Sequence, residues 1–131
     1  MSEELENSVR EMLKEETWTR AGISNFTKNN LMELAELLEK AHNQNCEYEI
    51  KDICDQQLAH TKDSIVALYI SGMVSLHSGS IDTSALVTLT EIFEKNHKEA
   101  LVEYLCQTIL DEDSQNKFAL RKLAEYYKET N

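Results

Sequence analysis

The chain contains no proline and three glycines among its 131 residues, and this scarcity constrains its fold more than any other feature. Proline and glycine mark most tight turns and interrupt regular elements, so a chain that nearly lacks them has few places for the turns of a β-sheet. Leucine, glutamate, lysine and alanine, which favour helices, are plentiful. The composition therefore predicts an all-α protein.

Apolar residues recur at helical spacing along most of the sequence. This period predicts helices over about residues 2–15, 28–42, 46–60 and 65–76, and further helices after Asp82, after Asn96 and after Asp113 or Ser114. Asn96 resembles the start of a capping box, and Asp113 or Ser114 is expected to cap the last helix. Residues 17–26, around Trp18, predict a short or irregular helix at best. The total is seven or eight helices joined by short connections.

The segment 65–76 is apolar nearly all round, so it is expected to be a central helix covered on several sides. Gly72 lies on its main apolar stripe, where a small residue would let a neighbouring helix approach closely. The segment is too short to span a bilayer, which requires about 18 apolar residues or more. It is therefore interpreted as the core of a folded domain.

The sequence also carries a weak internal repeat. A shift of 52 residues aligns Cys54 with Cys106, Leu58 with Leu110, Ala67 with Ala119 and Leu68 with Leu120. A tetratricopeptide repeat has two helices in about 34 residues, so a period of 52 requires a third helix. We therefore predict antiparallel helical hairpins stacked as a degenerate tetratricopeptide-like right-handed helical repeat.

The last helix, about 115–128, resembles the first helix of such a repeat, which cannot bury its apolar face alone. We expect it to pack on the preceding helix through Leu120, Leu123 and Tyr127, with its outer side bare. Residues 1–131 would then form a single domain at the N-terminal part of a longer protein. The bare side would favour weak self-association through this helix.

The charge balance excludes several classes of partner. With 24 acidic and 13 basic residues the formal net charge is −11, which repels nucleic acid and anionic lipid. The N-terminus is acidic, unlike that of a signal peptide, and no apolar run is long enough for a membrane span. Three cysteines at irregular spacing do not suggest a disulfide framework. We expect a cytoplasmic protein that does not bind nucleic acid or membrane directly.

The histidines and cysteines of residues 42–60 could have a chemical role or a structural one. His42, Cys46, Cys54 and His60 could bind a metal, or one cysteine could act as a nucleophile. However, the spacing is irregular, Cys54 lies on an apolar stripe, and the surrounding charge is negative. The acids 111–113 are interpreted as a helix-terminal feature rather than a cation site. We therefore predict no catalytic residue, no cofactor and no metal, and not an enzyme; a small thiol- or metal-dependent enzyme or sensor is the alternative.

Aromatic and basic residues near the end of the chain are the candidates for partner binding. Tyr126, Tyr104 and Lys128 are the predicted binding residues, since amphipathic aromatic side chains are enriched at protein interfaces. Tyr127 is expected to pack in the core and Tyr126 to be the freer of the pair. These residues indicate a protein-interaction module.

Three segments carry a family resemblance: 14–21 (KEETWTRA), 58–65 (LAHTKDSI) and 93–98 (FEKNHK). Together they resemble the long helical N-terminal extension that some bacteria attach to the Gre transcript-cleavage factor of RNA polymerase. The resemblance implies a regulatory or docking arm of a transcription elongation factor, with RNA polymerase or an associated factor as partner. The coiled coil that such factors insert into the polymerase has no counterpart here, so Asp111 and Glu112 are not assigned the role of its acidic tip.

Overall fold

The structure, a computed structural model, describes residues 2–15, 20–80 and 82–130. Within these ranges it contains seven α-helices, one 3-10 helix and no strand, which confirms the predicted all-α fold. Trp18 lies outside the described residues. The elements are α1 (Ser2–Glu15), η1 (Arg20–Asn25), α2 (Lys28–Asn43), α3 (Glu47–His60), α4 (Ile65–His77), α5 (Ser84–Lys95), α6 (Glu99–Glu112) and α7 (Lys117–Thr130).

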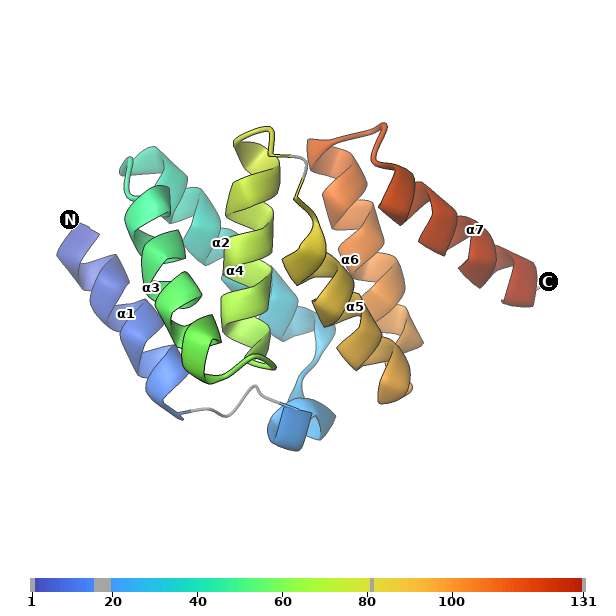
Figure 1. The fold of residues 1–131 in the computed structure, drawn as a ribbon, viewed down its shortest axis with the longest axis horizontal. Helices are drawn as coiled ribbons and strands as arrows, with labels where there is room; N and C mark the ends of the chain where they lie inside the picture. Colours follow the sequence, from blue (N-terminus) through green and yellow to red (C-terminus); the bar gives the residue numbers. More distant parts are fainter. Residues whose placement is uncertain (1, 16–19, 81, 131) are drawn as a thin grey trace.

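The helices lie side by side along the long axis of the molecule, with α1 at one end and α7 at the other (Figure 1). From α2 onward the connections are short, from three residues at 44–46 to six at 78–83, and consecutive helices run in opposite directions. α4 lies at the centre and packs against α3 and α5, and also against α1, α2 and α6. α7, in contrast, packs mainly against α6.

α4 is central because its sequence is apolar on all sides. It begins at Ser64, whose Oγ accepts a hydrogen bond from the Ala67 N–H at 3.3 Å. Every residue from Ile65 to Val74 is buried. At Gly72 the neighbouring helix comes so close that a Cβ would lie 2.6 Å from Cγ of Leu86 in α5. This distance confirms the predicted close approach at Gly72.

Two of the predicted N-cap residues are wrong, although both helices begin close to the expected places. Asn96 ends α5 instead of beginning α6: its Nδ2 donates to the Ile92 carbonyl at 2.8 Å, and Lys98 occupies the N-cap of α6. Asn116, not Asp113 or Ser114, caps α7, because its Oδ1 accepts the Ala119 N–H at 3.0 Å. In both places an asparagine amide satisfies a backbone group at a helix end, at the C-terminal end of α5 and at the N-terminal end of α7.

The repeat of 52 residues found in the sequence is also present in the positions of the helices. The bounds of α3 and α6 differ by 52, and so do the first residues of α4 and α7. Ser64 and Asn116 correspond under this shift, and each accepts the backbone N–H three residues further on. The α3–α4 and α6–α7 hairpins are therefore built alike. The right-handed sense of the stack and its tetratricopeptide class stay predictions.

Candidate functional site

α7 packs against the rest of the molecule through one face. Ala119 is fully buried, and Leu123 and Tyr126 are half-buried on the same side of the helix. Lys122, also on this side, forms an ion pair with Glu94 of α5, with an Nζ–Oε2 distance of 3.0 Å. Lys122 and Leu123 are three and four residues from Ala119, and Tyr126 is four and three residues from them, so one side of α7 faces the core and the other faces solvent.

The solvent side of α7 carries an exposed apolar strip. Leu120 is 46% exposed and Tyr127 is 44% exposed, and Ala124 lies exposed between them. The three residues are spaced by four and three positions, which places them along one line on the helix. We refer to Leu120, Ala124 and Tyr127 as the outer strip.

The outer strip has a buried equivalent in the preceding hairpin. Under the shift of 52 residues, Leu120 and Ala124 correspond to Leu68 and Gly72 of α4. Leu68 is 4% exposed, and Gly72 is covered by Leu86 of α5. The side of α7 that carries the outer strip is thus the side on which α4 receives a neighbouring helix.

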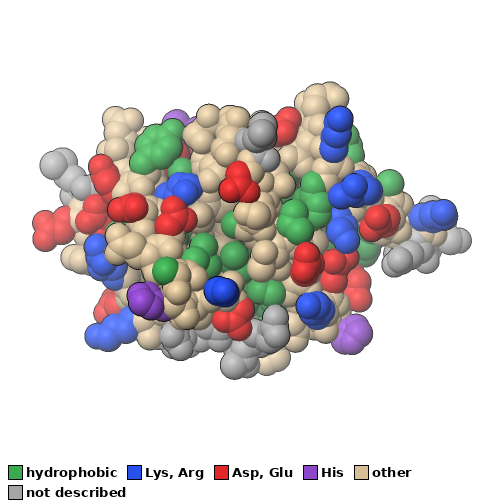
Figure 2. All heavy atoms as spheres, viewed as in Figure 1, with side chains coloured by type: hydrophobic (Ala, Val, Ile, Leu, Met, Phe, Trp, Pro, Cys, Tyr) green, Lys and Arg blue, Asp and Glu red, His purple; other side chains and the backbone are tan. Residues whose placement is uncertain are grey.

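Basic residues border the outer strip. Lys117, Arg121 and Lys128 are exposed and lie beside the strip on the same half of α7, since each is three or four positions from Leu120 or Ala124. Several blue Lys and Arg side chains in Figure 2 lie at the right-hand end of the molecule, where Figure 1 places α7. The formal net charge of the chain is −11, so this basic border stands out from an acidic protein.

The predicted orientation of α7 is wrong in two respects. Leu120 and Tyr127 were expected to pack on α6, but both are exposed. The helix is rotated about its axis relative to the prediction, so that Ala119, which is fully buried, faces the core in place of Leu120. Tyr126 was expected to be freer than Tyr127, but Tyr126 is half-buried and Tyr127 is exposed. Their rings contact each other edge to face, with centroids 5.7 Å apart. The apolar period found the helix, but it did not show that a small residue would make the contact.

The structure does not bring Tyr104 together with Tyr126 and Lys128. Tyr104 lies on α6, and Lys28 of α2 extends over its ring at 4.9 Å from the centroid. Cys106, two residues further on, lies close enough to Lys122 of α7 for that charge to affect its pKa. Two residues correspond to about 200° of rotation around a helix, so Tyr104 faces away from α7. Lys128 is exposed beside the outer strip.

The three cysteines are all buried and unpaired with one another. Burial raises the pKa of the Cys54 thiol to about 12 and that of Cys106 to about 11, and it also raises the pKa of Cys46. A thiolate is the form that attacks substrates or binds zinc, and these environments disfavour it. The arrangement therefore favours structural roles for the cysteines.

The other predicted chemical residues lie apart. His60 is exposed at the end of α3, and the acids 111–113 lie at the C-terminal end of α6. Asp113 is the C-cap of α6, and its Oδ1 accepts the Gln115 N–H at 3.2 Å. Glu112 contacts His77 of α4, with an Nδ1–Oε2 distance of 2.9 Å. The acidic triplet is thus divided between a turn and an interhelical contact.

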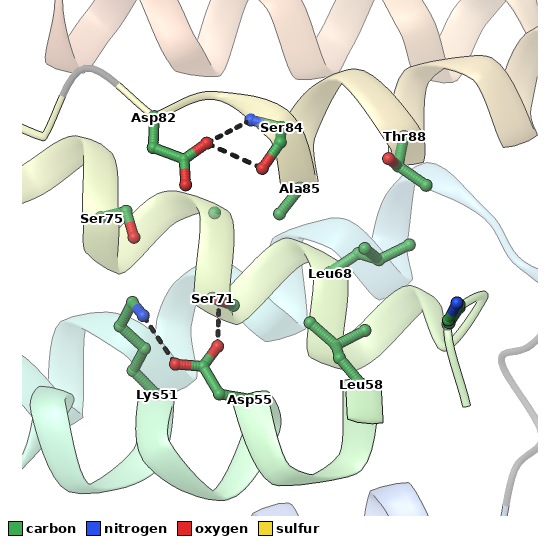
Figure 3. Close-up of a pocket in the computed structure, with 12 residues that line it drawn as sticks. Lys51, Asp55, Leu58, Leu68, Ser71, Ser75, Asp82, Ser84, Ala85 and Thr88 are labelled. Carbon is green, nitrogen blue, oxygen red and sulfur yellow. Dashed lines mark hydrogen bonds and ion pairs between the residues drawn. The ribbon is translucent and has the colours of Figure 1, made fainter. Parts of the chain in front are cut away.

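A polar groove opens between α3, α4 and α5 (Figure 3). Asp55 accepts a hydrogen bond from the Ser71 hydroxyl at 2.5 Å and pairs with Lys51 at 2.7 Å. Asp82 accepts from both the N–H and the hydroxyl of Ser84, at 3.0 and 2.7 Å. These polar groups already bind one another, so we interpret the groove as a structural seam between helices.

Among the helices of the described residues, none is both long and apolar enough to cross a bilayer. No protein-family model matches the chain, and no solved structure matches it.

Two known proteins, however, are similar to the chain. A protein of Treponema pallidum (strain Nichols) that is named for GreA-associated domains is 46% identical over 103 residues, which cover 79% of the chain and 16% of that protein. The transcription elongation factor GreA of Borreliella burgdorferi is 34% identical over 120 residues, which cover 92% of the chain and 13% of that protein. The chain therefore matches only a small part of each relative. The similarity confirms the predicted Gre-related resemblance.

Proposed function

Because this chain is a Gre-related helical domain, we propose that it is a non-catalytic docking module, the N-terminal regulatory or docking domain of a Gre-type transcription elongation factor. Its role is to hold that factor against a protein partner, RNA polymerase, in the cytoplasm. The outer strip of α7 is the docking surface.

The observation that supports this surface is a difference in solvent exposure between two equivalent residues of α4 and α7. Leu68 in α4 is 4% exposed, whereas its equivalent in α7, Leu120, is 46% exposed. In α4 the side is covered by α5, which places Leu86 against Gly72. A partner helix seated on α7 as α5 is seated on α4 would bury Leu120 and pack against Ala124, a residue small enough to permit close approach.

The charges around the strip define the chemistry of the partner. Lys117, Arg121 and Lys128 border it, whereas the chain as a whole carries a net charge of −11. An acidic amphipathic helix would therefore be attracted to α7 and repelled by most of the remaining surface. Its apolar residues would pack on the outer strip while its carboxylates pair with the basic border.

A direct binding measurement tests the proposal. RNA polymerase purified from the same organism is titrated against the fluorescently labelled full chain, and the dissociation constant is measured by anisotropy at several salt concentrations. Leu120→Glu should weaken binding about 10-fold or more, because central apolar contacts account for most interface energy. Tyr48→Glu is the matched control: Tyr48 is 59% exposed on α3, far along the chain from α7, and its replacement should leave binding unchanged.

Circular dichroism first checks that both variants keep their helical content. Binding that weakens with salt and is lost in Leu120→Glu alone supports the proposal. If the polymerase does not bind the wild-type chain, the proposed partner is wrong. If Leu120→Glu binds like the wild type, or Tyr48→Glu weakens binding equally, the outer strip is not the docking surface.

A further inference from the structure

Four helix ends meet at a pocket formed by α2, α3, α4 and α6. His42 is in the last turn of α2, Glu47 is the first residue of α3, and His77 and Glu112 are the last residues of α4 and α6. The His42 and His77 rings contact each other edge to face, with centroids 4.7 Å apart. Each ring also has a carboxylate: Nδ1 of His42 lies 3.1 Å from Oε1 of Glu47, and Nδ1 of His77 lies 2.9 Å from Oε2 of Glu112.

The local backbone explains how Glu47 reaches His42. Asn45 has a φ of 58°, a left-handed conformation that asparagine adopts more readily than most residues. This residue reverses the chain between α2 and α3 within three residues, 44–46. The side chains of His42 and Glu47 therefore meet across the turn, five residues apart in the sequence.

The pocket itself is partly apolar and strongly negative. Leu38, Met73 and Val74 contribute apolar surface from α2 and α4. A third carboxylate, that of Glu39, lines the same pocket as Glu47 and Glu112. Three carboxylates around two histidines favour a bound cation, and the apolar surface beside them reduces the competition from water.

The donor atoms lie close enough together to bind one small metal ion after a modest rotation of the side chains. One ligand atom each from His42, Glu47 and His77 lie within 4.8 Å of one another. Around a tetrahedral zinc ion, ligands at about 2.0–2.1 Å lie roughly 3.3 Å apart, close to the 3.1 Å between Nδ1 of His42 and Oε1 of Glu47. Rotation of the side chains would shorten the distances from His77 to the other two ligand atoms and complete the coordination of the ion.

Glu112, the fourth residue of the cluster, orients the ring of His77. Glu112 contacts Nδ1 of His77, which leaves Nε2 of the same ring available as a ligand. A histidine that binds a metal through one ring nitrogen commonly donates the other N–H to a carboxylate, and this contact orients the ring. The His77–Glu112 pair has that arrangement.

We propose that His42, Glu47 and His77 bind a Zn²⁺ ion, with Glu112 as a positioning residue for His77. Two histidines and one carboxylate form a three-residue zinc set that leaves a fourth position for water. The site differs from the sequence-based expectation of no metal, and it uses neither a cysteine nor His60. It is independent of the docking proposal, because it involves no residue of α7.

Zinc binding would tie the ends of α2, α3 and α4 together. An ion that binds only the folded chain stabilises it by mass action. At a zinc concentration about 100 times the dissociation constant, the melting temperature should rise by about 5 to 10 °C. The same addition should leave a chain without the site unchanged.

The test uses tag-free, reduced full-length chain, from which metal has been removed by a chelator, titrated with ZnCl₂ in a calorimeter. The wild type should bind one zinc ion per chain, and His77→Ala should lose this binding. Glu112→Gln should weaken it about 10- to 100-fold, as expected for a residue that orients a ligand. His60→Ala, which replaces another exposed histidine, is the matched control and should bind like the wild type.

His77 and Glu112 have side chains 42% and 41% exposed, so their replacement is expected to leave the fold intact, and circular dichroism checks this. Wild-type protein that binds no zinc stoichiometrically would overturn the proposal. Undiminished affinity in His77→Ala would also overturn it. Loss of binding in Cys46→Ala together with retention in His77→Ala would place the ion elsewhere and refute the assigned ligands.

Discussion

Replacing Gly72 with alanine should destabilise the protein, although alanine is the better helix former. The new Cβ would lie 2.6 Å from both Cγ and Cδ2 of Leu86, a distance at which either the Leu86 side chain or one of the two helices has to shift. Leu86 is fully buried, and protein interiors are closely packed, so a shift of its side chain disturbs its neighbours. The contact lies in the buried interface between α4 and α5, where a shift of side chains or helices costs the most stability.

The expected magnitude follows from two opposing terms. Alanine gains about 1 kcal/mol over glycine inside a helix, and overpacking a core costs about 1 to 3 kcal/mol. The 2.6 Å approach places this site at or above the upper end of that range, so the net loss should be about 2 kcal/mol. For a chain of 131 residues this lowers the melting temperature by about 5 to 10 °C. Gly72→Leu, which adds more atoms at the same place, should cost more.

A double-mutant cycle shows whether the loss comes from this contact. Leu86→Ala removes the two clashing atoms and alone should cost about 2 to 5 kcal/mol through the cavity it leaves. In the Gly72→Ala background it should cost about 1 to 3 kcal/mol less. Leu34→Ala, another fully buried leucine, on α2, is the control and should cost the same in both backgrounds.

Chemical denaturation of the four proteins of the cycle provides the measurement. An unchanged stability of Gly72→Ala would show that α4 and α5 do not approach each other as closely as the structure indicates. An additive cycle with Leu86→Ala would show that the loss arises elsewhere.

Three further predictions concern the cap, the cysteines and the outer strip. Asn116→Ala should lower the free energy of unfolding by about 1 kcal/mol in denaturation curves, since it removes the cap of α7; no loss would contradict the capping role. The Cys54 thiol, with its pKa raised to about 12, should resist alkylation in the native protein at pH 9, where an unfolded thiol of pKa 9.0 is half ionised, and stability should fall as pH rises from 9 to 12; rapid native alkylation would contradict its burial. Sedimentation should show weak, concentration-dependent self-association that Leu120→Glu abolishes and Tyr48→Glu preserves, whereas a strict monomer at high concentration would refute it.

The sequence alone determined the class of fold and most of the helices. Without proline and with little glycine, the chain can satisfy its backbone groups locally through helices, and their apolar period is visible in the residues themselves. The central place of α4 could also be predicted, because a helix that is apolar on every side has to be covered on every side. The same reasoning found Gly72, the one small residue on its main stripe. Segments similar to Gre-related proteins likewise lie in the sequence itself.

Only the tertiary structure decided which face of α7 is buried. The apolar residues of this helix cover more than one side, so its period is compatible with several rotations around the axis. Ala119 makes the close contact with the core, and this rotates Leu120 and Tyr127 towards solvent. The choice depends on the distance between α6 and α7, which is not a property of either sequence segment. Consequently the outer strip could not be assigned beforehand.

The cluster of two histidines and two glutamates depended on tertiary structure even more strongly. His77 and Glu112 are 35 residues apart in the sequence, and they meet because α4 and α6 end on the same side of the molecule. The spacing of residues in the sequence can predict a metal site when all the ligands lie in one turn or one helix. His42 and Cys46, four residues apart, were considered on this ground. Here only one pair, His42 and Glu47, is local. The other contacts are set by the packing of helices along the stack, because the ends of separate helices come together only after the core between them has formed.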